Sequence, residues 1–255
     1  MKLTVVFEDN ASMHGEEGVK AYPEGMGAYV AELYKKNGYE VTLITNDADS
    51  DGSQITDEII AQTDVMVWWG HLRHDNIRDE IANKIRLAVN NGMGFVALHS
   101  AHHSKPFKAL MGTTCNLSWR EIGERERLWV IDHAHPIVQG VPESVVIPHE
   151  EMYGEPFEIP TPDELVMVGW FQGGEIMRSC AVWKRVNGKV IFFQPGHETN
   201  PTYRIPAIQK ILLNVVEYAK PLKKIEKRVN HKSQPPEGDI KITDWEEKGS
   251  VTSLG

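Results

Sequence analysis

The sequence of 255 residues has few cysteines, no long hydrophobic run and no excess of positive charge. Two cysteines, Cys115 and Cys180, are too few for a disulfide framework, which favours a reducing, cytoplasmic location. No apolar run approaches the roughly 20 residues that span a bilayer, and the start MKLTVVFEDN turns acidic too soon for a signal peptide. The 27 basic and 36 acidic residues give a net charge of −9, which argues against nucleic acids and membrane surfaces as partners.

Several signatures of common enzyme sites are also missing. No G-x-G-x-x-G follows the first predicted strand and no G-x-x-x-x-G-K-[ST] occurs, so we expect no nucleotide cofactor. G-x-S-x-G and G-x-C-x-G are absent as well. The nearest equivalent is ALHSAHH, where a strand ends in a sharp turn with His99 at the apex of a nucleophile elbow and Ser100 after it. A serine hydrolase built on Ser100 stays an alternative.

The first half of the chain alternates short β-branched runs with helical periodicity. The predicted strands cover residues 3–7, 39–45, 64–69 and 94–99. The predicted helices cover residues 26–37, 77–91 and 106–111, and a long loop follows the first strand. Strands that alternate with crossover helices predict an α/β fold, with a mainly parallel sheet and helices on both faces.

The second half is predicted to add further β-strands and a last helix. These strands cover residues 128–132, 144–148, 165–170, 179–185 and 189–194. The dipeptide Asn187-Gly188 indicates a hairpin turn, and the last helix covers residues 206–219. We expect one α/β domain over residues 1–220, followed by an extended charged tail or an inter-subunit arm over residues 221–255. Because such an arm has little to pack on within its own chain, it favours a homo-oligomer.

Histidine is abundant, with eleven residues, and many of them follow predicted strands. Parallel α/β sheets place their sites at the carboxyl ends of the strands, so these side chains are expected to converge. His99, Glu151 and His197 come from three separate segments and could ligate one divalent metal. Zinc is our first expectation, with manganese or iron as alternatives. Without a metal, His99 would be a general base, with Glu151 orienting it or acting as a second proton donor. His71 is a fourth candidate catalytic residue.

Seven ordered segments resemble the trehalose-utilisation protein family, ThuA-like. They are YPEGM (22–26), WWGHLRHD (68–75), LHSAHHSKPFKALMGTTCNLSWRE (98–121), ERLWV (126–130), EEMYGE (150–155), WFQGGE (170–175) and PGHETNPTY (195–203). The resemblance implies a flavodoxin-like fold of the class I glutamine-amidotransferase-like superfamily. The position of the catalytic cysteine in true glutaminases is matched by His99, and the late histidine-glutamate pair by His197-Glu198. Without a thiolate the acyl-enzyme route is lost, so we expect no glutaminase activity.

The resemblance also implies a role in the breakdown of trehalose or related disaccharides, with a small-molecule sugar as the ligand. We expect a metal-assisted enzyme acting on a (3-keto) disaccharide, with isomerase, lyase and hydrolase chemistry all open. A non-catalytic sugar-binding or regulatory protein on the same fold is the alternative. The candidate sugar contacts are polar or aromatic residues of the matched motifs: Arg73, His74, Asp75, His102, Asn116, Trp119, Arg120, Glu121, Tyr153 and Glu198. For Arg120 the alternative is a surface network of ion pairs.

Overall fold

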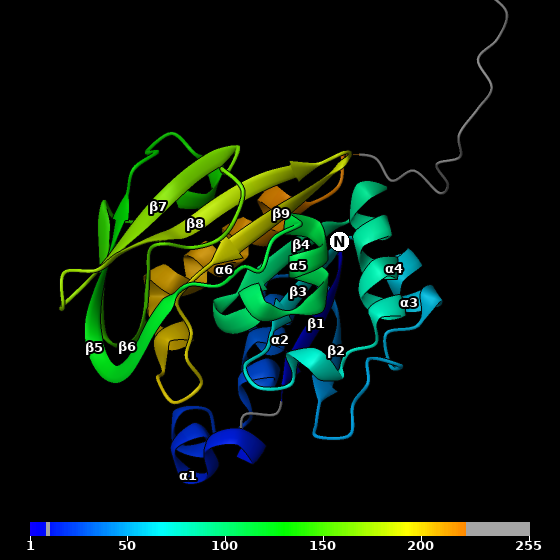
Figure 1. Cartoon of the computed structure of the whole chain (residues 1–255), viewed down its shortest axis with the longest axis horizontal. Coiled ribbons are helices and arrows are strands. Elements are labelled where there is room, and N and C mark those ends of the chain that lie inside the picture. Colours follow the sequence, from blue (N-terminus) through cyan, green and yellow to red (C-terminus); the bar gives the residue numbers. More distant parts are fainter. Residues whose placement is uncertain (9–10, 223–255) are drawn as a thin grey trace, which may run out of the picture.

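The structure, a computed structural model, describes residues 1–8 and 11–222, with only the helical backbone for residues 11–14. In this part of the chain one nine-stranded mixed sheet has the order β2-β1-β3-β4-β9-β8-β7-β5-β6 (Figure 1). Five neighbouring strands are parallel: β2 (Glu40–Asn46), β1 (Lys2–Glu8), β3 (Val65–Trp69), β4 (Gly94–Leu98) and β9 (Gly188–Phe193). The antiparallel extension consists of β8 (Ile176–Arg185), β7 (Glu164–Phe171), β5 (Ser118–Val130) and β6 (Ser144–Gly154).

The parallel part has the 2-1-3-4-5 order of flavodoxin-like folds, because β9 occupies the fifth place. Helices cover both faces. One face packs on α2 (Met26–Lys36) and α6 (Pro206–Ala219). The other packs on α4 (Asp79–Asn90) and α5 (Lys105–Met111). The predicted α/β fold, with a mainly parallel core and extra strands in the second half, is therefore confirmed.

The burial of the central strands explains why their sequences are continuous apolar runs. Every residue of β3 and β4 is buried, because helices lie above and below them. The helix α6 approaches β4 so closely that a Cβ on Gly94 would lie 2.4 Å from the Ala219 carbonyl oxygen. Glycine at this position is required for the close packing of the helix on the sheet.

Two helices of the first half were not predicted. The segment expected as a loop contains α1 (Ala11–Ala21), whose two glycines, Gly15 and Gly18, and few apolar residues hide a helical pattern. The short helix α3 (Asp57–Gln62) is capped by Thr56, whose side chain accepts the backbone N–H of Ile59 at 3.2 Å. Neither helix contributes a residue to the predicted site.

The second half corrects three boundaries. β5 begins at Ser118, well before the predicted start, because its first residues are mostly exposed and polar and do not read as a strand. β6 continues to Gly154, so Glu151 lies within the strand and not after it. The hairpin turn is Val186-Asn187, with Arg185 paired to Gly188. A Cβ on Gly188 would lie 2.2 Å from the Val89 carbonyl oxygen, so this glycine serves a close approach to α4.

The predicted tail lies almost wholly outside the described residues, which end at residue 222. The division into a domain and a tail, and the homo-oligomer inferred from it, stay predictions. Among the described residues, no helix has the length and apolar character that crossing a membrane requires.

Candidate metal centre

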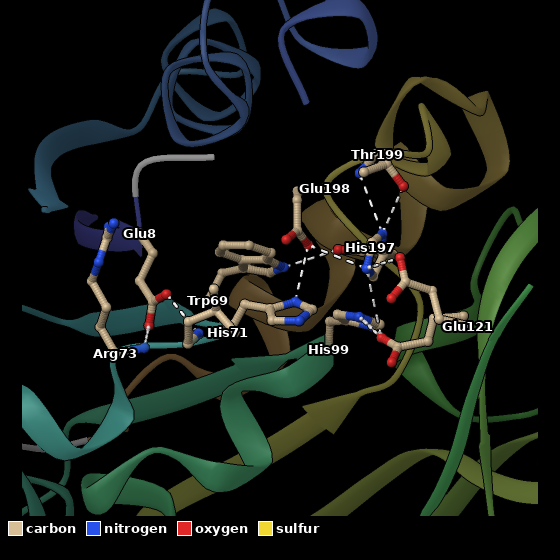
Figure 2. A network of polar contacts seen from close by, with 12 residues as sticks. Glu8, Trp69, His71, Arg73, His99, Glu121, His197, Glu198 and Thr199 are labelled. Carbon is tan, nitrogen blue, oxygen red and sulfur yellow. Dashed lines mark hydrogen bonds and ion pairs between the residues drawn. The ribbon is translucent and has the colours of Figure 1, made fainter. Parts of the chain in front are cut away.

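Three imidazole rings and one carboxylate converge at the carboxyl edge of the parallel strands. His71 follows β3, His99 follows β4, His197 follows β9, and Glu151 reaches the same point from β6. One ligand atom from each of the four lies within 4.8 Å of the others. Figure 2 shows the three rings facing a common point, with centroids 5.2–6.3 Å apart. The structure thus brings together the three predicted metal ligands and adds His71 to them.

His99 stands at the apex of a sharp turn between β4 and a 3₁₀ helix over His99–His103. Its φ of +52° is rare for a residue with a side chain, as expected for an elbow. The fully buried ring donates from Nδ1 to the Gln194 carbonyl oxygen and from Nε2 to Glu151, each at 2.9 Å. Burial alone would lower the pKa of His99, but the hydrogen bond and charge of Glu151 outweigh it and raise the pKa to about 9. Without a metal, the ring is a cation at neutral pH.

His71 is held by the fully buried carboxylate of Glu198. The Nδ1–H of His71 donates to Glu198 Oε2 at 3.1 Å. Burial opposes the charge on both groups, but their hydrogen bond raises the pKa of His71 and lowers that of Glu198 to about 2. Glu198, predicted as a sugar contact, is not among the residues that line the cavity, and its hydrogen bond orients His71.

His197 places its Nε2 among several carboxylates. The distances from Nε2 are 3.3 Å to Glu121 Oε1, 3.8 Å to Glu198 Oε2 and 3.9 Å to Glu151 Oε2. Burial nevertheless lowers the pKa of His197 to about 4, so this ring is neutral at pH 7. Its Nδ1 accepts the backbone N–H of Thr199 at 3.3 Å and lies 2.8 Å from the hydroxyl of the same residue. When Nε2 binds a metal, Nδ1 carries the ring proton and this hydroxyl can accept its hydrogen bond.

These contacts fit a divalent metal ion. The Nδ1 of each ring already has a partner, namely Glu198 for His71, Gln194 for His99 and Thr199 for His197. Such outer contacts fix the rings of metal-binding histidines and direct Nε2 to the ion. A bound divalent cation would also supply the positive charge that the protonated ring of His99 carries in the metal-free protein. Three imidazoles and a carboxylate suit zinc, manganese and iron alike.

A cavity of about 440 Å³ opens beside this cluster. Five of the predicted sugar contacts line it: His74, His102, Trp119, Glu121 and Tyr153. The remaining lining residues are His71, Leu72, Ser100, His103, Leu117 and Glu151. Trp119 is 65% exposed, so it forms part of the rim. The cavity therefore joins the cluster to an aromatic surface open to solvent.

Two histidines of the cavity wall are neutral. Burial lowers the pKa of His74 to about 3 and holds that of His102 well below its usual value. The Nδ1–H of His102 donates to the Cys115 carbonyl oxygen at 2.8 Å, so the ring is fixed inside the protein. Neutral imidazoles can both donate and accept hydrogen bonds, which suits hydroxyl groups of a ligand.

Four further predicted sugar contacts do not line the cavity: Arg73, Asp75, Asn116 and Arg120. Arg120 donates to Glu124 and to Glu175, each at 2.7 Å, which is the surface ion-pair network left open by the sequence. The side chain of Arg73 lies 3.4 Å from the Asn46 carbonyl oxygen, beyond Glu8 in Figure 2. Asp75 and Asn116 are exposed and outside the lining. A residue that is near one of the site histidines in the sequence does not necessarily point its side chain into the cavity.

Two buried carboxylates that sequence analysis did not select support the histidine-bearing loops. Glu8, the last residue of β1, accepts the backbone N–H of Leu72 at 2.9 Å and of Arg73 at 3.0 Å. Glu150 accepts the backbone N–H groups of Gly196 and His197, each at 3.0 Å, in the loop after β9. An acidic residue in or at the end of a buried strand is the only sequence signal that could have found them.

The sequence matches the family model ThuA, trehalose utilisation, over residues 11–219. The chain belongs to the ThuA family. No curated protein matches it. Among solved structures, a ThuA-like protein of Parabacteroides merdae has 15% identity and a TM-score of 0.66, covering 89% of this chain and 93% of that one. A ThuA-like protein of Bacteroides uniformis has 16% identity and a TM-score of 0.58, covering 85% and 89%.

A protein of Salmonella typhimurium, described as cytoplasmic, has 12% identity and a TM-score of 0.55, covering 87% of this chain and all of that one. At these identities the likeness shows the fold alone. The fold of this ThuA protein is flavodoxin-like, as the strand order of its parallel part shows.

The residues His197 and Glu198, which the resemblance matches to the glutaminase histidine and glutamate, have different hydrogen-bond partners. Glu198 contacts His71 through Nδ1, whereas the Nδ1 of His197 is held by Thr199. Within the described residues no histidine or carboxylate hydrogen-bonds to Ser100 Oγ, so nothing activates that hydroxyl as a nucleophile. This geometry favours neither a glutaminase nor a serine hydrolase.

Proposed function

We propose that this ThuA-family protein is a metal-assisted enzyme of sugar catabolism that acts on a keto-disaccharide such as 3-keto-trehalose. The observation that carries the proposal is the cluster of four ligand atoms within 4.8 Å of one another. The cluster lies beside a cavity of about 440 Å³ with polar and aromatic walls. The description of the family, trehalose utilisation, supports a disaccharide as the ligand. We place this activity in the cytoplasm, in line with the description of the Salmonella neighbour.

His71, His99, Glu151 and His197 would hold the metal, with zinc as the first choice and manganese or iron as alternatives. When bound, such an ion polarises a keto oxygen and makes the C–H bond next to the carbonyl more acidic. His99 must lose its Nε2 proton before that nitrogen can ligate. The Gln194 carbonyl then keeps the ring in place through Nδ1.

Glu121 is the base that this site offers. Its carboxylate lines the cavity, is 42% exposed and lies 3.3 Å from His197 Nε2. We propose that it removes the proton from the carbon next to the keto group. Return of the proton from the other side gives isomerisation, whereas departure of the glycosyl oxygen with its bonding electrons gives β-elimination. Burial raises the pKa of Tyr153 well above its usual value, so it stays a phenol that can protonate the leaving oxygen.

The sequence also allowed a metal-free enzyme with His99 as a general base. The structure argues against it, because the raised pKa of His99, about 9, leaves the ring protonated at neutral pH. Both ring nitrogens are engaged, with Gln194 and with Glu151, so neither has a lone pair to accept a substrate proton. The metal-assisted route is therefore the better supported.

The test is incubation of the purified, zinc-loaded protein with 3-keto-trehalose in deuterated water, followed by NMR. We expect consumption of the sugar, or deuterium at the carbon next to the keto group. Glu121→Gln should lower the rate by roughly 100-fold or more, the range for loss of a general base, while metal content is unchanged. Sugar binding with neither exchange nor consumption would contradict the enzyme and favour the non-catalytic sugar-binding protein.

A further inference from the structure

The loop that carries His197 is folded around one buried side chain, the carboxylate of Glu150. Its Oε1 accepts the backbone N–H of His197 at 3.0 Å. Its Oε2 accepts the N–H of Gly196 at 3.0 Å and the hydroxyl of Thr202 at 2.8 Å. The Glu151 N–H donates to Oε1 as well, at 3.0 Å, so two donors occupy each oxygen. Glu150 has no exposed surface, so these donors replace water completely.

We infer that Glu150 is a positioning residue that sets the place and orientation of His197 in the metal centre. Its hydrogen bonds fix the backbone at Gly196 and His197 and hold the side-chain hydroxyl of Thr202, five residues after His197. It does not line the cavity and is not among the four clustered ligands, so it acts only through the loop. The inference rests on the proposed function, because it takes His197 to be a metal ligand.

The position of Glu150 in β6 couples two parts of the centre. Glu151, the next residue, bonds to His99. Successive residues of a strand point to opposite faces. One face of β6 therefore supplies the ligand Glu151, and the opposite face supplies Glu150, which supports the ligand His197. A displacement of β6 would therefore move Glu151 and His197 together.

The same arrangement recurs at the other histidine loop. Glu8 accepts the consecutive backbone N–H groups of Leu72 and Arg73, directly after His71. It too is buried and lies at the carboxyl edge of the sheet. Two ligand-bearing loops are thus each supported by a carboxylate from another strand, which is what a positioning role requires.

Glu150→Gln tests the inference with almost no change of size. Glutamine offers one oxygen and one NH₂ group, so whichever way the amide turns, an NH₂ donor faces two other donors. Either the N–H of His197 or the N–H of Gly196 then loses its acceptor. The loop must shift to restore its hydrogen bonds, and His197 moves with it.

The experiment uses Co²⁺ alone as the probe with the full-length protein. In Glu150→Gln we expect the dissociation constant for Co²⁺ to rise roughly 10- to 100-fold, as for loss of an outer support of a metal ligand. At saturating Co²⁺ the visible absorption spectrum should also change, which a general loss of stability would not cause. Hydrogen exchange at the amides of Gly196 and His197 in the metal-free protein should accelerate roughly tenfold or more.

Glu164→Gln is the matched control. Glu164 accepts hydrogen bonds from His135 at 2.9 Å and Tyr218 at 2.7 Å, and it is not among the residues of the cavity or the metal cluster. This variant should bind Co²⁺ like the wild type. If Glu150→Gln does not fold, Thr202→Val removes one of the same hydrogen bonds and should give a smaller change in the same direction.

A folded Glu150→Gln with wild-type affinity, spectrum and amide exchange would overturn the inference. So would equal effects in Glu164→Gln. A wild type that binds no Co²⁺ would instead contradict the proposed function. The amide exchange of the loop in the metal-free protein would then decide on the positioning role alone.

Discussion

Replacing Gly196 by alanine should destabilise the protein far more than a typical glycine substitution. Gly196 has a φ of +132°, a region that other residues rarely enter, at a strain of about 1–3 kcal/mol. An added Cβ would lie 2.1 Å from the hydroxyl oxygen and 2.3 Å from the Cζ of Tyr203, a fully buried ring. Forcing extra volume into such a packed place adds about 1–3 kcal/mol. The expected loss is therefore about 2–6 kcal/mol.

Urea denaturation of Gly196→Ala, together with its thermal midpoint, measures this loss. For a chain of this size 1 kcal/mol corresponds to about 2–4 °C, so a loss of about 2–6 kcal/mol lowers the thermal midpoint by roughly 4–24 °C. Gly112→Ala is the control, because Gly112 has a φ of +74° but no atom within 4 Å of the added Cβ. It should show the strain alone, about 1–2 kcal/mol.

Tyr203→Phe in the Gly196→Ala background should recover part of the stability, since it removes the nearest atom of the clash. If Gly196→Ala were as stable as Gly112→Ala, the described packing of the loop that carries His197 would be wrong.

Three further predictions concern other parts of the molecule. Burial raises the pKa of Cys180 to about 12 and also raises the pKa of Cys115. Neither thiol should therefore react with a thiol reagent at pH 8 until the protein unfolds. Rapid labelling of the native protein would contradict this. Burial opposes the charge of Glu155, but its hydrogen bonds to Arg178 at 2.7 and 2.8 Å lower its pKa below the unfolded value. The pair therefore stabilises the fold above the pKa of the unfolded state, about 4.3, and this stability is lost as the pH falls through the pKa of the folded state. In urea denaturation, the free energy of unfolding of Glu155→Gln should approach that of the wild type in acid. Trp119→Ala should change stability by less than about 0.5 kcal/mol and weaken sugar binding measured by calorimetry, because the ring is on the rim of the cavity; unchanged sugar affinity would exclude it as a contact.

The parallel half of the fold could be predicted because its strands are buried on both faces. Continuous apolar runs such as those of β3 and β4, separated by periodic helices, have few alternative interpretations. The antiparallel extension was harder to predict from the sequence. The first residues of β5 are mostly polar and exposed, and register shifts interrupt the pairing of β5 with β6 between Arg120 and Glu126. Such irregular, half-exposed strands leave no clean alternation in the sequence.

The convergence of the histidines could be predicted in the same way, since His71, His99 and His197 follow parallel strands whose carboxyl ends share one edge. Glu151 was predicted by the same rule, as a carboxylate that follows a strand, but it lies within the antiparallel edge strand β6 and reaches the centre from the far end of the sheet order. The rule for parallel strands therefore does not explain its place. An acidic residue in a buried strand could have drawn attention to Glu150, but which backbone N–H groups it binds has no signature in the sequence.

Elemental analysis of the purified protein, after incubation with zinc and extensive dialysis, shows whether the proposed ligands His71, His99, Glu151 and His197 bind a metal ion. We expect about one divalent ion per chain in the wild type and a small fraction of that in His99→Ala. A folded wild type without metal, or a His99→Ala variant that retains the full amount, would contradict the account.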